Sequence, residues 1–175
     1  MSFFAMFPQG NYDLTNTKNY KLVTDLFRRV KVRTKVLNET SLYSEYVVPD
    51  GEKPEITALK HFGDAQLHWV ILLTNNITDP THDWPLSYSD FERYVTDKYA
   101  NPQGVHHYEK VQSSGPTSSI DYSHLIECNS TDTGAQSVSN YDYEEREQEK
   151  KRRIKLMNPS FLPIFLQEFE RLISK

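Results

Sequence analysis

The sequence has few cysteines and no long apolar runs. Its 175 residues include one cysteine, Cys128, which cannot form an internal disulfide, so we expect a protein made in a reducing compartment. No uninterrupted apolar run is longer than five residues, as in Trp69 to Leu73, whereas a transmembrane helix needs about 20. The N-terminus lacks the basic stretch that opens a secretory signal peptide. We therefore expect neither a membrane span nor a signal peptide.

An excess of positive charge is also missing. The chain carries 20 Lys and Arg against 24 Asp and Glu, which gives a formal net charge of -4. Domains dedicated to nucleic-acid binding are usually strongly basic. The overall charge therefore argues against a nucleic acid as the partner of this protein.

Motifs for catalysis and for cofactor binding are absent from the sequence. It has no G-x-S-x-G elbow, no phosphate-binding glycine loop and no G-x-G-x-x-G. His106 and His107 are adjacent, and because neighbouring strand residues point to opposite faces, we expect them not to share a metal ion. Two carboxylates for glycoside hydrolysis need no fixed spacing, but no pair stands out. The sequence therefore predicts no enzyme, no metal and no cofactor.

The apolar content is sufficient for a folded chain but low. Leu, Ile, Val and Phe make up 43 of the 175 residues, which is above the range of disordered chains. A chain of this length buries roughly two-thirds of its unfolded surface if it is compact. We expect a folded protein in which some segments become ordered only against a partner.

Two patterns follow each other in the first 40 residues. Apolar residues from Val23 to Val30 recur at i, i+3, i+4 and i+7, which predicts an amphipathic helix over about 19–29. From Val30 to Val36 they alternate with Lys and Arg, which predicts a half-buried strand with a basic outer face. Residues 28–35 hold five positive charges and no acid. Such a face is either solvated or binds an acidic protein or a phosphate backbone.

Residues 41–111 show the clearest local signals. Tyr43 to Val48 predicts a strand, and the next helix begins at Pro54 and ends at Gly63 with a left-handed cap. Asp64 then caps a helix that reaches about Asn75 and has almost no polar side. Further predictions are a short helix capped by Ser89 or Asp90 and a strand over 105–111. The predicted core residues are Phe62, Trp69, Val70 and Leu73.

The remaining residues change in composition at two points. Between 112 and 140, 11 of 29 residues are Ser or Thr, which is typical of a linker or an insert. The acids from Glu144 and the bases that end at Arg153 are ordered as a helix dipole favours. Residues 154–157 should be extended, and Ser160 should cap a final helix with an aromatic face.

Together these patterns predict an α+β fold in four parts. Residues 1–40 form an N-terminal arm with a helix and a basic strand, and residues 41–111 form a strand–helix–helix core. Residues 112–139 are an insert or linker, and residues 140–175 form a charged helix followed by an aromatic helix.

The segment from Tyr46 to Ile56, followed by Lys60-His61-Phe62-Gly63-Asp64, resembles the front half of a LysM module. In that family a strand, a Pro-Gly-Asp type of turn and a helix ending in Tyr/Phe-Gly lead to a second helix that ends near Asn, where this sequence has Asn75 and Asn76. The resemblance implies binding of peptidoglycan or N-acetylglucosamine. Trp84-Pro85-Leu86 departs from the pattern because it precedes any closing strand, so the sugar groove would be altered or covered.

A longer series of motifs resembles a phage family. It comprises Thr24-Asp25-Leu26-Phe27-Arg28-Arg29, the LysM-like segment, Trp69 to Leu73, Ile77 to Pro80, Trp84-Pro85 and Glu149 to Leu156. The series is similar to the baseplate wedge subunits known as gene product 53 of contractile-tailed, T-even-type bacteriophages. The likeness spans about residues 1–110 and 140–173. It implies a structural protein of the virion tail baseplate, assembled in the host cytoplasm in hetero-oligomers with other wedge and hub-proximal tail proteins.

The resemblance and the residue pattern together suggest where partners bind. Apolar anchors bordered by charge are typical of interfaces. The predicted interface residues are Phe3, Phe4, Phe7, Arg28, Arg29, Arg33, Trp84, Phe161, Phe165 and Phe169. The alternative for the aromatic residues is that they cover the protein's own core.

Overall fold

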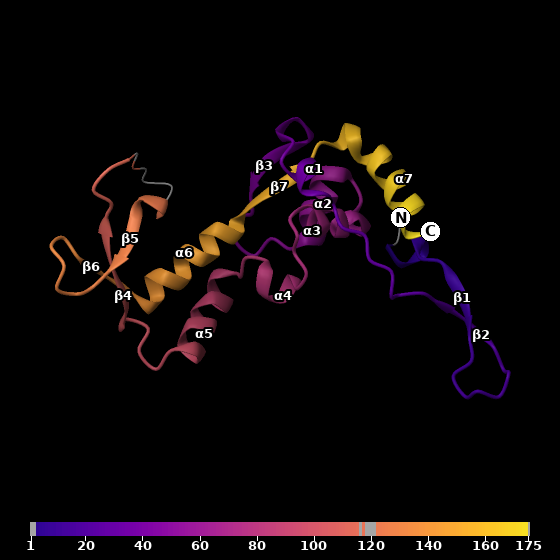
Figure 1. Ribbon diagram of the computed structural model, residues 1–175, viewed down its shortest axis with the longest axis horizontal. Coiled ribbons are helices and arrows are strands. Elements are labelled where there is room, and N and C mark those ends of the chain that lie inside the picture. Colours follow the sequence, from indigo (N-terminus) through magenta and orange to yellow (C-terminus); the bar gives the residue numbers. More distant parts are fainter. Residues whose placement is uncertain (1–2, 116, 118–121, 175) are drawn as a thin grey trace. The chain divides into compact units, whose positions relative to one another are not determined.

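The computed structural model describes residues 3–115, 117 and 122–174 and has an α+β fold (Figure 1). The chain divides into two compact units. Unit 1 comprises residues 1–84 and 152–175, and unit 2 comprises residues 85–151. Within the described residues, no helix is long and apolar enough to cross a membrane.

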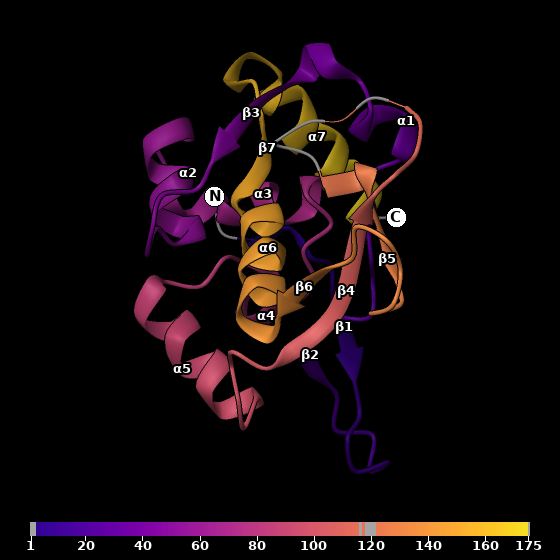
Figure 2. The same cartoon turned by 90° about the vertical axis from the view of Figure 1, so that its left-hand side faces the viewer.

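Unit 1 is built on two strands that are distant in sequence. β3 (Tyr43–Val47) pairs antiparallel with β7 (Arg153–Met157), so that Tyr43 lies opposite Met157 and Val47 opposite Arg153. The strands lie side by side in both views (Figure 1 and Figure 2). Between them in sequence come α2 (Pro54–Phe62), the 3-10 turn Ala65–Leu67, α3 (His68–Thr74), α4 (Pro80–Asp83) and all of unit 2.

The helix predicted from Pro54 to Gly63 is confirmed, whereas the helix predicted after Asp64 begins as the 3-10 turn Ala65–Leu67 and becomes α-helical at His68. Pro54 lies in the first turn of α2, where no intrahelical donor is required. Gly63 adopts a left-handed conformation with φ 77° and donates its N–H to the Leu59 carbonyl. The Asp64 carboxylate accepts a hydrogen bond from the N–H of Gln66 at 2.9 Å. The predicted strand over 43–48 and the extended segment at 154–157 are also present, as β3 and β7.

Asn75, which follows α3, holds the outer edge of β7. Its side-chain amide donates to the Lys155 carbonyl at 2.8 Å, and its side-chain oxygen accepts from the Lys155 N–H at 2.8 Å. One side chain thus makes the pair of hydrogen bonds that a neighbouring strand would make. β7 is therefore fixed by β3 on one edge and by Asn75 on the other.

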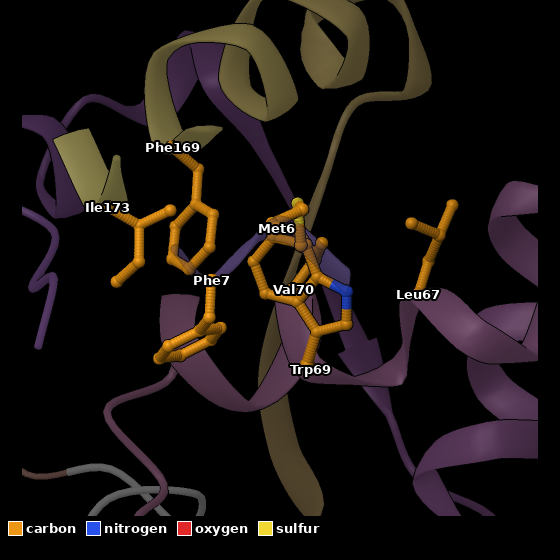
Figure 3. Close-up of a cluster of buried hydrophobic side chains, with 7 residues drawn as sticks. All are labelled: Met6, Phe7, Leu67, Trp69, Val70, Phe169 and Ile173. Atoms are coloured by element: carbon orange, nitrogen blue, oxygen red, sulfur yellow. The ribbon is translucent and has the colours of Figure 1, made fainter. Parts of the chain in front are cut away.

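The core of unit 1 forms two clusters on either side of α3. One contains Met6, Phe7, Leu67, Trp69, Val70, Phe169 and Ile173 (Figure 3). The other contains Val48, Ala58, Ile71, Trp84, Ile154 and Leu156. Phe62 is half-buried and packs against both, while Leu73 is half-buried against the first. α3 buries side chains into both clusters because it has almost no polar side.

The two ends of the chain meet in the first cluster. The 3-10 turn Phe3–Met6 places Met6 and Phe7 against α7 (Leu162–Ile173), which contributes Phe169 and Ile173. The Trp69 and Phe169 rings are 4.6 Å apart between centroids (Figure 3). The predicted cap residue of this helix, Ser160, is replaced in that role by Asn158. The Asn158 side chain accepts the Ser160 N–H at 3.1 Å and so caps the 3-10 turn Pro159–Phe161, which leads into α7.

The predictions for residues 19–36 are wrong. The segment forms β2 (Lys21–Thr24), which pairs with β1 (Gln9–Tyr12), and a single helical turn, α1 (Thr34–Leu37), preceded by loop. In the apolar stripe that predicted a helix, only Val30 packs against the core, while Val23 and Leu26 are exposed and Phe27 is 98% exposed. A helix of about 11 residues without packing is marginal in water, so pairing with β1 is favoured instead.

Unit 2 consists of two helices and a three-stranded sheet. α5 (Tyr88–Lys98) and α6 (Asn140–Arg152) accompany β4 (Val105–Val111), β5 (Leu125–Cys128) and β6 (Gln136–Ser139) in the antiparallel order β5-β4-β6. Two short 3-10 turns, Thr40–Leu42 in unit 1 and Tyr122–His124 in unit 2, complete the described elements. The strand predicted over 105–111 and the charged helix are confirmed, as β4 and α6.

Polar contacts fix the helices of unit 2. Ser87, rather than Ser89 or Asp90, caps α5 and accepts the Asp90 N–H at 3.3 Å. The buried Glu144 carboxylate of α6 accepts hydrogen bonds from Lys98 Nζ and from the Tyr99 hydroxyl, both at 2.7 Å. Burial would raise the pKa of Glu144, but these hydrogen bonds outweigh it and lower the pKa. A charged Glu144 therefore joins α6 to the end of α5.

Replacement of Trp69 by Ala tests the central cluster. Trp69 is 6% exposed and contacts rings from both ends of the chain, so the change should lower the free energy of unfolding by about 3–5 kcal/mol. Urea denaturation followed by the fluorescence of buried Trp84 measures it. Leu59→Ala, at a position 54% exposed on α2, is the control and should cost less than about 0.5 kcal/mol. Equal midpoints for the two variants would contradict the placement.

Candidate protein interface

The most exposed element of unit 1 is the two-stranded ribbon of β1 and β2. All eight residues of its strands are exposed, and it projects from the unit in both views (Figure 1 and Figure 2). The register pairs Asn11 with Leu22 and Tyr12 with Lys21. Opposed residues in an antiparallel pair share a face, so Leu22 lies on one face while Tyr12 and Val23 lie on the other.

Large apolar side chains continue through the ribbon, its loop and the residues that follow. Phe27 is 98% exposed and Leu14 is 81% exposed. The full set, each more than two-fifths exposed, is Tyr12, Leu14, Tyr20, Leu22, Val23, Leu26 and Phe27. Single exposed apolar residues are ordinary, but seven within 16 consecutive positions are typical of an interaction surface. We call residues 9–27 the N-terminal ribbon.

The base of the ribbon is fixed to the core of unit 1. The Asp25 N–H donates to the Pro8 carbonyl at 2.9 Å, which continues the pairing beyond the strands. Arg28 donates from Nε to Asp25 at 3.1 Å and from Nη1 to the Ile173 carbonyl at 3.4 Å. The Arg28 hydrogen bond also lowers the pKa of Asp25. Both ends of the ribbon are therefore held while its middle extends into solvent.

Asp13 organises the loop between β1 and β2. Its carboxylate accepts N–H donors from Lys18 at 2.7 Å and from Thr15 at 3.1 Å. Asn16 and Lys18 both have positive φ, at 57° and 62°. Desolvation would raise the pKa of Asp13, but the backbone hydrogen bonds lower it below its usual value. An ionised Asp13 therefore stabilises a loop that contains two left-handed residues.

The charge of this region is opposite to that of the rest of the chain. Residues 9–35 hold seven Lys and Arg against two Asp, whereas the remaining residues hold 13 bases and 22 acids. Both aspartates, Asp13 and Asp25, already accept local hydrogen bonds. Arg29 and Arg33 are exposed and make no ion pair with another described residue. With seven bases and two acids, the region thus carries a formal net charge of +5.

The other predicted interface residues fall into three groups. Phe7, Trp84 and Phe169 are buried in the core clusters of unit 1, so they serve the chain's own packing rather than a free surface. Phe3, Phe165 and Arg28 are half-buried, and all three contact unit 1 itself. Phe4, Phe161, Arg29 and Arg33 are exposed. The aromatic residues of the two termini therefore meet each other around Trp69.

The LysM-like turn is covered by the chain itself. The buried indole of Trp84 donates from Nε1 to the Glu52 carbonyl at 2.8 Å. The Glu52 carboxylate accepts from the Thr57 hydroxyl at 2.7 Å, from the Tyr46 hydroxyl at 2.9 Å and from Lys60. Burial raises the pKa of Glu52, but these donors lower it overall. Residues 49–53 are thus fixed from both sides by internal contacts.

The histidine pair of unit 2 is arranged differently from the prediction. A bulge in β4 between Val105 and His107 breaks the alternation, and the Nδ1 atoms of His106 and His107 lie 2.8 Å apart. The expectation that they face opposite sides is therefore wrong. His106 stacks on Tyr143 with ring centroids 4.0 Å apart, and His107 contacts Glu109 at 2.9 Å. Among residues that the structure describes, no three potential ligands converge on a metal position.

Sequence reasoning missed the ribbon itself. Its strands are four residues long, and QGNY and KLVT show no strong alternation. The signal that points to it is the polar stretch from Asp13 to Asn19, which is rich in turn-forming residues and separates the two segments.

Two comparisons with known proteins agree. The family described as Base plate wedge protein 53 matches residues 2–116. The Baseplate wedge protein gp53 of Enterobacteria phage T4 is 25% identical over 166 residues, which cover 87% of this chain and 85% of that protein.

Asp13→Ala tests the order of the ribbon loop. The variant should raise amide hydrogen exchange several-fold at Thr15 and Lys18, because both N–H groups lose their acceptor. In the unaltered protein, hydrogen exchange at the same amides should also rise as the pH falls below about 4. The folded loop lowers the pKa of Asp13, so the charged carboxylate stabilises the loop and its protonation removes that stabilisation. Asp97→Ala, on an exposed position of α5, is the control. Unchanged exchange in Asp13→Ala would contradict the assignment.

Proposed function

The chain belongs to the base plate wedge protein 53 family, and from this premise we propose that it joins neighbouring proteins of a baseplate through the N-terminal ribbon and the basic segment that follows it. It is a structural component of a phage baseplate wedge. It is located in the tail baseplate of the virion. We also propose that it is assembled into the baseplate in the host cytoplasm. Its partners in this proposal are other wedge and hub-proximal proteins, in hetero-oligomers.

The observation that carries the proposal is the exposure of the ribbon. A two-stranded ribbon without a packed face is only marginally stable in water. Here, seven large apolar residues remain exposed on a ribbon whose base is fixed to the core. Burial of apolar surface drives protein association, so this region gains more from a partner than any other exposed strand or helix described.

We also propose that the protein has no enzymatic activity. The buried carboxylates Glu52 and Glu144 each accept several local hydrogen bonds that tie neighbouring elements together. Their contacts are those of structural groups. A scaffold that joins other proteins requires no reacting group.

Binding of peptidoglycan by the LysM-like segment is the less favoured function. It requires an accessible groove beside the turn at 49–53, whereas Trp84 is buried against Glu52 there. We propose that this part of unit 1 has a LysM-like origin, and its strand–helix–helix arrangement supports that proposal. The function that we propose does not depend on that origin.

The Ser/Thr-rich segment is part of the proposal as a variable addition. Its strands β5 and β6 pair only with β4 in the described residues, and all three belong to unit 2. Replacement of residues 112–139 by a short Gly/Ser linker should leave unit 1 folded. Both tryptophans, Trp69 and Trp84, lie in unit 1, so their fluorescence in urea reports on that unit alone. Unfolding of unit 1 would contradict the prediction.

A stop codon in the phage gene tests the function. Without the chain, tails should lack complete baseplates, and the intact chain supplied from a plasmid should restore them. Electron microscopy of tails and infectious titre measure the outcome. Normal baseplates in the stop-codon phage would overturn the proposal.

A second plasmid separates the ribbon from the rest of the protein. The Asp25 N–H and the Pro8 carbonyl are 2.9 Å apart, so a three-residue Gly linker can replace residues 9–24 without moving the base. This variant should melt as the intact chain does and fail to restore baseplates. Replacement of residues 129–131, which are exposed in the turn between β5 and β6, by Gly and Ser is the control and should restore them. Equal restoration by both would show that the ribbon is not the interface.

A further inference from the structure

The N-terminal ribbon has exposed apolar side chains on both of its faces. Leu22 is 65% exposed on one face, while Tyr12 and Val23, 57% and 41% exposed, lie on the opposite face. A ribbon that lay flat on a partner would bury one face and leave the other in water. The distribution of apolar side chains therefore favours a partner that encloses the ribbon from two sides.

The edges of the ribbon are also free. Among the strands of the described chain, β1 and β2 pair only with each other, so each leaves one row of backbone N–H and C=O groups without a strand partner. Such edges are templates for hydrogen bonds with another chain. The two strands have only four residues each, but they contain no proline, and Lys21 is their one charged residue, so the side chains of these edges do little to prevent such contacts.

Charge identifies the chemistry of the partner. The seven Lys and Arg of residues 9–35 are opposed there by two aspartates that are already hydrogen-bonded. An isologous contact between two ribbons would bring these like charges together. An acidic protein surface complements them, and the apolar side chains require that surface to carry an apolar cleft.

We infer that the N-terminal ribbon inserts as a tongue into an apolar cleft with an acidic rim on a different baseplate protein. Leu22 and Val23 contact opposite walls of the cleft. Arg29 and Arg33 follow the ribbon in sequence and pair with carboxylates at the rim of the cleft. This inference rests on the proposed function and specifies the class of partner and the mode of contact.

Photocrosslinking on both faces tests the insertion. Baseplate wedges are purified from a host infected with the stop-codon phage, and the purified full-length chain carrying p-benzoylphenylalanine at position 22 or 23 is added back. Both positions should crosslink to the same protein, through peptides of the cleft walls that mass spectrometry identifies. The same group at Leu59, exposed on α2, is the control and should not label those peptides.

Each other outcome has a defined meaning. A crosslink from only one of the two positions would show a flat contact and overturn insertion. Labelling of a second copy of the chain, or of DNA, would overturn the assigned partner. If the unaltered chain enters the wedges but neither position crosslinks, the inference fails while the proposed function stands. If the unaltered chain does not enter the wedges at all, the proposed function fails.

A charge-reversal pair tests the rim. The double variant Arg29→Glu and Arg33→Glu should slow association with the purified wedges at least about tenfold at low salt, and the difference should shrink as salt is added. The matched control is Lys53→Glu with Arg153→Glu, two exposed bases elsewhere in unit 1 that change net charge by the same amount. Its association rate should stay within about twofold of the unaltered chain. Equal slowing by the two double variants would overturn the assigned rim.

Discussion

The pairing of β3 with β7 holds the fold together. These strands come from either side of unit 2 in sequence, and β7 carries Ile154 and Leu156 into the cluster beneath α3. Asn75 fastens the other edge of β7, so that the end of α3 and the returning chain are fixed at one place. α7 follows directly and brings Phe169 and Ile173 to the cluster that contains Trp69. Both clusters are thus completed by the last two dozen residues.

The same arrangement gives the N-terminal ribbon a firm base. Met6 and Phe7 are buried before the ribbon begins, and Arg28 reaches the Ile173 carbonyl after it ends. Because both ends are fixed, binding of the ribbon orders fewer residues than binding of a free tail would. Phe7 and Phe169, from the two termini, therefore pack in the core on which the ribbon stands.

The parts of the fold that depend on local chemistry could be predicted from the sequence. The residues Pro54, Gly63 and Asp64 each act through neighbours a few positions away, and the structure has them as expected. The partner of β3 could not be predicted, since β7 lies more than 100 residues later. The stripe from Val23 to Val30 fits a helix as well as a partner-facing surface, because periodicity does not say which chain covers it. The bulge that turns His106 beside His107 likewise depends on pairing with β6.

The position of unit 2 between α3 and β7 also has a consequence for synthesis. On the ribosome, β3, α2 and α3 emerge before unit 2, and they wait without their closing strand until residues 153–157 follow. Domains tend to fold as units during synthesis, so unit 2 has time to form while unit 1 is incomplete. The base of the ribbon is finished only when α7 arrives. A chain that stops before α7 therefore lacks the Ile173 carbonyl that Arg28 contacts, so only a chain made to its end holds the ribbon on a fixed base.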